Sequence, residues 1–318
     1  MVSVIRYVAF GIVIDDLVFE DGRQVLGVLG GGGPQAAFGM RLWGEGVGLV
    51  AAVGADWPGA HRAQLEAAGI DLSGVVTGPW PTLRAWQIYG NAGERRHVWR
   101  VAPGRDRPDW ARCLALAPTD YRAARGYHLG LHAEAANLGL VRQLRAYGGY
   151  VSLELFRPAP HPLDAGALRA LACAPDILSL TLEEAQSLYA SKAPLSSEKT
   201  GLWADLVRRL HQAGARRVAL RLGPEGALVS DGRAGQAWHI PAFPTTVADP
   251  TGAGNAFSGA FLVGYLETNN LLTAGLWGSV AASLMIEGVG VPRLDAALRL
   301  EAGRRAQALR PQVRAVRI

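Results

Sequence analysis

The chain has 318 residues and a mass of 33.7 kDa, with 49% hydrophobic residues, 19% charged residues and a mean hydropathy of +0.12. This apolar fraction is enough to bury a sizeable core, which excludes disorder of the whole chain. The net charge of +5 comes from scattered arginines, whereas a nucleic-acid interface needs a denser basic patch. Two cysteines, Cys113 and Cys173, are too few for a disulfide framework or a metal cluster.

The N-terminal segment lacks the pattern of a secretory signal. Arg6 interrupts its apolar run, and no small-residue cleavage site follows. The longest uncharged stretch, residues 268–286, contains polar residues and glycine breaks that favour a buried helix over a membrane span. We therefore expect a cytoplasmic protein that binds neither membranes nor nucleic acids.

Strands and helices alternate along most of the chain. A β-branched run at 2–16 predicts one buried strand, at whose end stand Asp15 and Asp16. A short strand from residue 24 leads into four glycines, Gly30–Gly33, and a helix is expected from Pro34. Further strands are expected over 47–54, 126–132, 150–156, 176–181, 216–223 and 226–232. Helices are expected over 59–68, between residue 132 and residue 145, and over 182–190, and the last third of the chain is expected to be rich in helix.

Residues 82–101 break this rhythm. Apolar and polar residues alternate on either side of a turn at 90–93, which predicts a half-exposed hairpin. Its Trp86 and Trp99 either cover a bound ring or form an apolar interface between two chains. The alternation elsewhere predicts an α/β fold, a doubly wound and mostly parallel sheet flanked by helices, in a single domain over 1–318.

The segment 248–266 is the most informative in the chain. Gly252, Ala253 and Gly254 stand directly before an apolar helical run, where free backbone N–H groups and the helix dipole form an anion cradle. Asp249 lies just upstream, and Asn255 lies in the first helical turn, where its side chain can point at a bound anion. The alternative interpretation is a glycine turn that packs the helix closely against a sheet.

The run D-P-T-G-A-G-N at 249–255 resembles the signature D-T-x-G-A-G-D of the ribokinase-like (PfkB) carbohydrate and nucleoside kinases. Further segments resemble the family in the same order, at 30–44, 47–59, 153–158, 176–185 and 219–229. The resemblance implies a ribokinase-like fold with a small β-sheet lid from about 15–29 and 84–101. It also implies ATP and Mg²⁺, a small-molecule sugar or nucleoside substrate, and a possible homodimer through the lid.

The resemblance also implies roles for individual residues. Substrate would be bound by Asp15, Asp16, Gly32, Gly33 and Gln35; phosphoryl transfer would involve Asp249, Gly252, Ala253, Gly254 and Asn255; nucleotide would be bound by Arg221, Gly223, Gly226 and Thr251; and metal would be ordered by Glu184.

Four positions depart from the family pattern. Asn255 replaces the aspartate that acts as general base, and an amide cannot take a proton there. Loss of such a base typically costs about 10²–10⁴-fold in rate. Gln35 and Thr181 stand where the family usually has asparagine, while Arg221 occupies a position that is often threonine.

Three explanations of Asn255 remain open at this point. The chain is a divergent member that binds ligand or does another reaction, a kinase whose base is Asp15, Asp16 or Asp249, or a protein engineered to trap its substrate. The leading function is ATP-dependent phosphorylation of a sugar or nucleoside hydroxyl, with Asn255 orienting the nucleophile. The alternatives are a catalytically impaired binding protein and a hydrolase that uses the same pocket.

Overall fold

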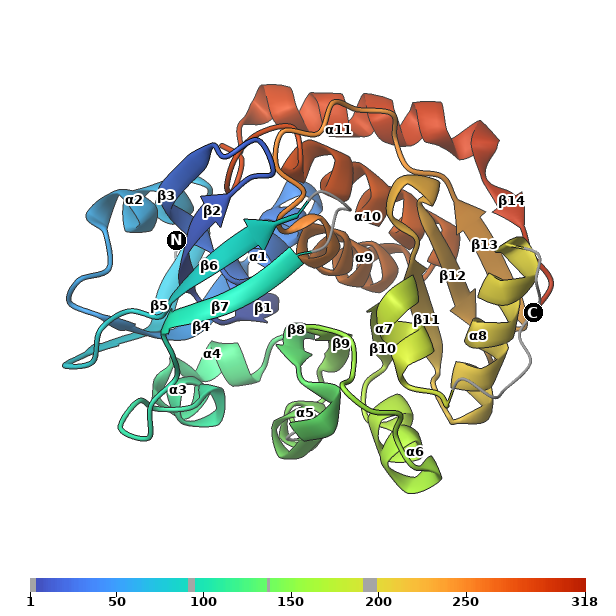
Figure 1. The fold of residues 1–318 in the computed structure, drawn as a ribbon, viewed down its shortest axis with the longest axis horizontal. Coiled ribbons are helices and arrows are strands. Elements are labelled where there is room, and N and C mark those ends of the chain that lie inside the picture. The colour runs from blue at the N-terminus through green and yellow to red at the C-terminus, as the bar shows by residue number, and fades with distance from the viewer. Residues whose placement is uncertain (1–3, 91–94, 136–137, 191–198) are drawn as a thin grey trace.

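The computed structural model describes residues 4–90, 95–135, 138–190 and 199–318. A ten-stranded sheet runs through the molecule (Figure 1). In spatial order its strands are β14 (Arg314–Ala315), β13 (Gln236–Ile240), β12 (Ala227–Asp231), β11 (Arg217–Arg221), β10 (Ile177–Thr181), β9 (Tyr150–Leu155), β8 (Gly126–Leu131), β1 (Tyr7–Phe10), β4 (Val47–Gly54) and β5 (Ile70–Gly78). The strands from β11 to β5 pair in parallel, and β12 to β14 extend one edge in antiparallel pairing.

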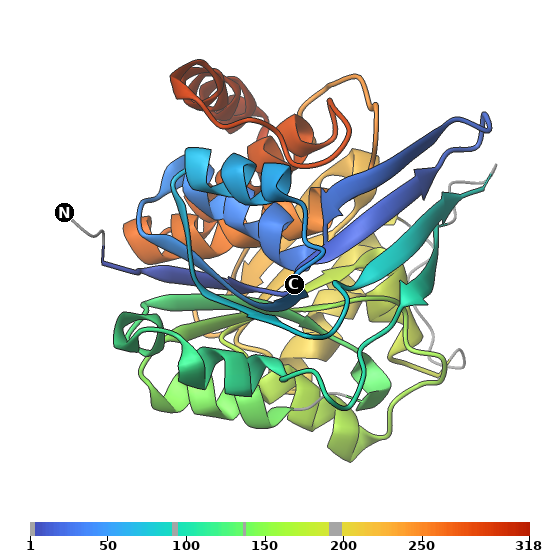
Figure 2. The ribbon, with the colours of Figure 1, turned by 90° about the vertical axis from the view of Figure 1, so that its left-hand side faces the viewer.

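Helices cover both faces of this sheet, and Figure 2 shows the resulting three layers. One face carries α1 (Gly32–Trp43), α2 (Gly59–Ala67), α9 (Ala253–Thr268), α10 (Leu271–Met285) and α11 (Ala296–Leu309). The other carries α3 (Trp110–Leu116), α4 (Thr119–Arg122), α5 (Leu138–Ala146), α6 (Ala165–Cys173), α7 (Leu182–Ser187) and α8 (Lys199–Gln212). Three short 3₁₀ turns lie at Ala133–Ala135, Gly223–Glu225 and Arg310–Gln312.

Strand β1 contributes side chains to the hydrophobic cores on both faces of the sheet. Tyr7 and Ala9 pack with the α1 and α9 side, whereas Val8 and Phe10 pack with the opposite side. Successive side chains of a strand point to opposite faces, so a strand buried on both faces is apolar throughout. The predicted α/β class, with a mostly parallel sheet flanked by helices, is confirmed.

A second sheet stands apart from the first and has the order β3 (Gln24–Gly30), β2 (Val13–Val18), β6 (Arg84–Tyr89), β7 (Arg95–Val101). Strands β2 and β6 pair in parallel, and each is joined to an antiparallel partner. Figure 2 shows this sheet projecting beyond the layered body. The turn of the expected 82–101 hairpin, residues 91–94, lies outside the described residues.

The opening apolar run differs from its prediction as a single strand. It forms β1 in the main sheet and β2 in the second sheet, with a break at Gly11, whose φ is 90°. A left-handed φ suits glycine and ends the extended run. Because of this break, the chain crosses from one sheet to the other and carries Asp15 out over the ends of the parallel strands.

Helices α1 and α9 pack backbone to backbone, which positions the site. A methyl group at Gly39 would overlap the carbonyl of Ala256, and one at Gly259 would overlap the carbonyl of Ala36. At the start of α9, Asn255 contacts Gln35 of α1 and faces Gly32, so the N-termini of the two helices meet there. Within the described residues, no helix combines the length and apolarity needed to cross a membrane.

Candidate active site

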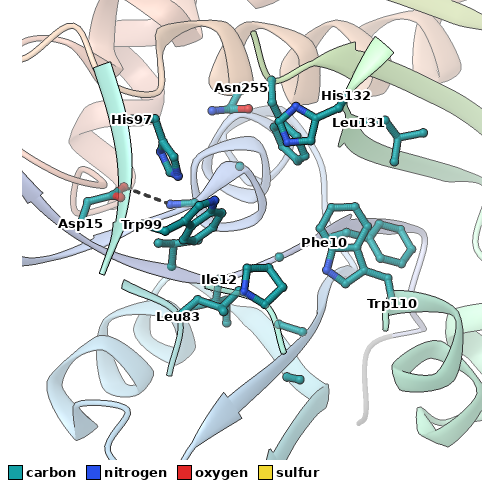
Figure 3. Close-up of a pocket in the computed structure, with 18 of the residues that line it drawn as sticks. Phe10, Ile12, Asp15, Leu83, His97, Trp99, Trp110, Leu131, His132 and Asn255 are labelled. Carbon is teal, nitrogen blue, oxygen red and sulfur yellow. Dashed lines mark hydrogen bonds between the residues drawn. The ribbon is translucent and has the colours of Figure 1, made fainter. Parts of the chain in front are cut away.

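A cavity of about 760 Å³ lies between the second sheet and the N-termini of α1 and α9 (Figure 3). Its two ends differ in chemistry. One end is lined by Asp15, Gly32, Gln35, Gln87, Thr251 and Asn255. The other end is lined by Phe10, Trp110, Leu131, Leu140 and Phe156, together with the polar residues Asp109, His132 and Arg157. Trp99 and His97 of β7 line it from the second sheet. The cavity is therefore suited to a ligand with one hydroxyl-rich end and one flat apolar end.

Asn255 contributes an amide to the polar end, from the first turn of α9. Its Nδ2 donates a hydrogen bond of 2.6 Å to Gln35 Oε1 on α1. Its Oδ1 faces Gly32, where an added methyl carbon would lie 3.1 Å away. Gln35 uses one of the two Asn255 N–H donors, so the amide still offers a second N–H and its oxygen to a hydroxyl, but it cannot remove the hydroxyl proton.

Asp15 and Asp16 separate at this site, because adjacent residues on a strand face opposite sides. Asp15 lines the cavity and accepts a 2.9 Å hydrogen bond from Gln87 Nε2 and one of 3.3 Å from the Gly31 N–H. Burial raises the pKa of Asp15 to about 6 despite these donors. Asp16 lies outside the cavity lining, where it pairs with Arg100 and accepts the Gly27 N–H at 2.8 Å.

The loop before α9 leaves the N-terminus of this helix without a side-chain cap. Gly252 is the N-cap residue with φ 85°, and no side chain caps the helix. The Ala253 N–H donates to the Pro250 carbonyl at 3.5 Å, while the next N–H groups in the first turn of α9 are available to a ligand. Asp249 Oδ1 accepts the Thr251 N–H at 2.9 Å, and the Thr251 hydroxyl also contacts Tyr89 of β6. Asp249 thus fixes the conformation of the loop through its hydrogen bond with Thr251, and Thr251 lines the cavity.

A buried ionic network lies beside the cradle. Arg221 Nη1 is 3.3 Å from Glu154 Oε2, and its Nη2 is 3.4 Å from Glu184 Oε2. Glu154 also accepts a 3.2 Å hydrogen bond from the Ser258 hydroxyl and lies 3.7 Å from His128 Nε2. Burial alone would raise the pKa of Glu154, but Arg221 and His128 outweigh it and hold that pKa low. The network joins three strands of the sheet to α9.

Glu184 differs from Glu154 in its surroundings. Burial raises the pKa of Glu184, and Arg221 and the Thr181 N–H only partly offset it. Its Oε2 accepts the Thr181 N–H at 2.8 Å, and the Thr181 hydroxyl accepts the Glu184 N–H, which together form a capping box for α7. Thr181, at a position usually asparagine in the family, is thus a helix cap here.

Glu184 is the residue expected from the sequence to order a metal ion. A Mg²⁺ ion takes oxygen ligands with free lone pairs; Oε2 of Glu184 already receives a backbone N–H and a guanidinium, so Oε1 is the oxygen left for a metal ion. Among the residues that the structure describes, no three His, Cys, Asp or Glu side chains gather as metal ligands. Because Mg²⁺ at a nucleotide site needs only one or two protein carboxylates, the role of Glu184 toward a metal ion stays a prediction.

Gly223 and Gly226 flank the 3₁₀ turn after β11. An added methyl group at Gly223 would meet nothing within 4 Å, so this backbone is open to a ligand. At Gly226, with φ 91°, it would strike the backbone of β13, so this glycine is required by the turn itself. Their roles toward a nucleotide stay predictions.

Some residues of the site were not singled out as site residues from the sequence. Glu154 falls within the segment 153–158 that resembles the family, and it lies at the centre of the network. Its signal was an acidic residue inside the otherwise apolar strand β9, where an unpaired charge would be costly. Gln87 shares a face of β6 with Ala85 and Tyr89, so the alternation of the hairpin contained it, but only pairing with β2 brings it to Asp15.

Comparison with known proteins agrees with this architecture. The pfkB family carbohydrate kinase profile matches residues 6–294, nearly the whole chain. This chain belongs to the pfkB family. A cytidine kinase from Thermococcus kodakarensis is 28% identical over 252 residues, which cover 79% of this chain and 85% of that protein. A nucleoside kinase from Methanothermobacter thermautotrophicus is 27% identical over 259 residues, or 80% of this chain and 77% of that protein.

Solved structures with a similar fold were also found. An Arabidopsis thaliana ribokinase complexed with ribose and ATP superimposes with a TM-score of 0.70 at 20% identity, covering 95% of this chain and 98% of that one. This likeness shows the shared fold. The predicted family membership is confirmed, and a kinase is what the named relatives support. The roles assigned to single residues, the boundaries of the lid and a dimer through it stay predictions.

Proposed function

We propose that this pfkB-family protein transfers the γ-phosphoryl group of ATP to a hydroxyl group of a nucleoside. The observation that carries the proposal is the two-ended cavity, whose polar end meets the α9 cradle and whose other end is aromatic. The two named nucleoside-kinase relatives support the same substrate class.

The aromatic end favours a nucleoside over a free sugar. Phe10 and Trp110 lie with ring centroids 5.7 Å apart, Trp110 and Phe156 at 6.4 Å, and His132 and Phe156 at 5.2 Å. Figure 3 shows Phe10, Trp110 and Leu131 on the opposite side of the cavity from Asp15. A nucleobase presents flat π faces that such a wall can bind, whereas a sugar alone would leave it without a partner.

At the polar end, each group has a distinct task. The second N–H of the Asn255 amide, which Gln35 does not use, would donate to the oxygen of the acceptor hydroxyl and orient it for attack on the γ-phosphorus, while the hydroxyl hydrogen points away from Asn255. The new O–P bond forms as the bond from phosphorus to the bridging oxygen breaks, and ADP leaves. The hydroxyl proton must leave the substrate. Of the three aspartates considered from the sequence, only Asp15 lines the cavity, so we assign it the role of proton acceptor.

ATP would supply the phosphoryl group, and the chain offers it an anion-binding surface. The uncapped N–H groups at Gly252–Gly254 suit the developing negative charge of the transfer. Thr251 lines the cavity directly before them, so donor and acceptor would meet at the start of α9. Positioning and charge stabilisation of this kind carry most of the catalysis in phosphoryl transfer.

A second function is favoured by one contact. The Asn255 amide is tied to Gln35 at 2.6 Å, an arrangement that suits ligand binding without proton transfer. In that case the protein binds nucleoside and nucleotide but transfers no phosphoryl group between them. A hydrolase would differ from both in its products, which would be free phosphate or free base.

The test incubates the protein and its Asn255→Asp variant with ATP, Mg²⁺ and separate acceptors: cytidine, uridine, adenosine, ribose and 2-dehydro-3-deoxygluconate. Phosphorus NMR follows the fate of the γ-phosphate. A new ester on a nucleoside with the unchanged protein supports the proposal. An ester only on ribose or the sugar acid overturns the nucleoside assignment. Free phosphate or free base indicates hydrolysis, and ligand binding without product from either protein indicates the binding function.

A further inference from the structure

Three side chains of the second sheet form a hydrogen-bonded row along one wall of the cavity. Asp15 of β2, Gln87 of β6 and His97 of β7 all line the cavity, and strand pairing sets Gln87 opposite His97. Gln87 is 5% exposed, and its Nε2 lies 2.9 Å from Asp15 Oδ1 and 3.0 Å from His97 Nδ1. A single amide nitrogen therefore bridges the carboxylate and the imidazole.

The orientation of the Gln87 amide follows from its neighbours. An ionised carboxylate only accepts hydrogen bonds, so the amide has to turn an N–H group toward Asp15. The pKa of Asp15 is about 6, so this carboxylate is mostly ionised above that pH. The opposite orientation would place Gln87 Oε1 against a carboxylate oxygen. The second N–H of the same nitrogen is then directed to His97 Nδ1, which has to be an unprotonated acceptor.

The protonation state of His97 is set by the same surroundings. Burial lowers the pKa of His97, and the positive charge of Arg95 lowers it further. A neutral imidazole carries one proton, and because Nδ1 accepts from Gln87, that proton is on Nε2. The ring of Trp99 packs edge to face against the imidazole, with centroids 4.5 Å apart, and limits its rotation. His97 thus has an Nε2–H donor with a fixed direction.

This donor is not used within the described part of the chain. His97 Nε2 makes no hydrogen bond to another described residue, whereas Nδ1 is bonded to Gln87. A sugar hydroxyl can both donate and accept, so Asp15 can accept from one hydroxyl while His97 donates to the oxygen of another. A ligand without that second hydroxyl would leave the His97 donor unpaired, which lowers its affinity.

We propose that His97 is a specificity-determining residue: its Nε2–H donates to a sugar hydroxyl that is not phosphorylated, at the 2′ or 3′ position, and so selects ribonucleosides over deoxyribonucleosides. Gln87 is its positioning residue, because it fixes the tautomer of His97. The inference rests on the proposed function, since it names the class of nucleoside bound at the same site. It can be tested without phosphoryl transfer, because nucleoside binding is measured without ATP.

The first measurement is the tautomer of His97. In protein labelled with ¹⁵N at histidine, long-range ¹H–¹⁵N spectra distinguish the Nε2–H, Nδ1–H and protonated forms, and the signals lost in His97→Asn identify His97. We expect the Nε2–H form at pH 7.5. In Gln87→Leu the imidazole loses the N–H that fixes it, so both neutral tautomers should be populated. A predominant Nδ1–H or protonated form in the unchanged protein overturns the inference.

The second measurement is the affinity for nucleosides, by isothermal titration calorimetry with cytidine, adenosine and the 2′-deoxy and 3′-deoxy form of each. Two variants separate the ring nitrogens, as counted in bonds from Cα. His97→Asn keeps an acceptor at the position of Nδ1 but has no donor at that of Nε2, whereas His97→Gln keeps a donor at the position of Nε2. The matched control is Val98→Ala, because Val98 is the next residue of β7, faces away from the cavity and is 39% exposed.

We expect the unchanged protein to bind one of the two deoxy forms about 5- to 10-fold more weakly than the ribonucleoside, which is the effect of one hydrogen bond. His97→Asn should weaken the ribonucleoside by the same factor and remove the difference for that analogue. His97→Gln and Val98→Ala should keep the difference. Equal affinities of the unchanged protein for the ribonucleoside and both deoxy forms overturn the inference, and so does an unchanged difference in His97→Asn.

The outcomes distinguish this inference from the proposed function. Binding that prefers ribonucleosides through His97, without any phosphate ester, refutes the kinase and leaves the inference standing. Ester formation on ribonucleosides and deoxyribonucleosides with equal KM refutes the inference and leaves the kinase standing. Binding of no nucleoside by the unchanged protein overturns both. If the His97 variants fail to fold, the tautomer and the deoxy comparison in the unchanged protein still decide the inference.

Discussion

The two sides of the α9 N-terminus carry different kinds of polar group. Toward the cavity, Asn255 and Gln35 form a neutral pair of amides. Beside Gly254, Arg221 lies among the carboxylates of Glu154 and Glu184. The groups that face the cavity are therefore neutral, while the charged groups lie beside the helix start in a buried network. If the protein is the kinase proposed above, substitutions on the two sides should affect acceptor and nucleotide differently.

The largest effect is expected on the acceptor side, from Asp15→Asn. If Asp15 accepts the proton, the rate with ATP and nucleoside should fall by about 10²–10⁴-fold, while ATP affinity stays the same. The matched control is Asp16→Asn on the same strand, which should keep the rate within a few-fold but lower the melting temperature, because it loses the contacts with Arg100 and the Gly27 N–H. Equal losses of rate in the two variants would refute the distinct role of Asp15.

The same substitution has a stability consequence with a defined sign. The pKa of Asp15 is raised from 3.8 to about 6, so folding favours the protonated form. This contribution is fully present below pH 3.8 and is lost as the pH rises through about 6. At pH 7 Asp15→Asn should therefore stabilise the protein by roughly 1–3 kcal/mol, and this gain should vanish by pH 4. Urea unfolding at both pH values measures it. The rate of the unchanged protein should also decline as the pH falls through about 6.

The next effect is on the phosphate side, from Gly254→Ala. The added methyl must displace the end of the buried Arg221 side chain from the carboxylates of Glu154 and Glu184, so the free energy of unfolding should fall as well. ATP affinity should fall by about tenfold or more, since the displaced guanidinium loses its place beside the cradle. Gly303→Ala on α11 is the control, because a methyl there meets nothing within 4 Å. Calorimetry with ATP decides the result, and equal affinities for the two variants would contradict it.

A smaller effect is expected at the aromatic end, from Trp110→Ala. Loss of one wall of the cavity should raise the KM for a nucleoside by about 10-fold, in line with the contribution of an aromatic contact. The KM for ATP should stay unchanged and serves as the internal control. Steady-state kinetics with cytidine and with ribose sharpen the comparison, because ribose has no base and its KM should not move.

The smallest effect is expected from Gln35→Asn, at the junction of the two sides. The shorter side chain loses the 2.6 Å contact with Asn255 and frees the amide. One neutral hydrogen bond contributes about 1 kcal/mol, so the KM for the nucleoside should rise by roughly fivefold. The measurement is the KM for each substrate in turn. A larger change for ATP than for the nucleoside would place Gln35 on the phosphate side.

Much of the fold followed from local pattern. The apolar strands and the glycine start of α9 were predicted from residues close together in the chain. The break at Gly11 was not, because a single glycine inside an apolar run does not reveal that the chain changes sheets. The two adjacent aspartates were grouped as substrate ligands, and only the orientation of β2 separates them, with Asp15 in the cavity and Asp16 paired with Arg100.

By itself, the sequence determined the class of fold, the family and the uncharged residue at position 255, since these depend on local periodicity and on a contiguous motif. Only the tertiary structure decided what surrounds that residue. Arg221 of β11, Glu154 of β9 and Glu184 of α7 meet beside α9, and Gln87 of β6 reaches Asp15 of β2 within the second sheet. Contacts between such distant segments depend on how strands pair and helices pack, and residue spacing along the chain does not contain that information.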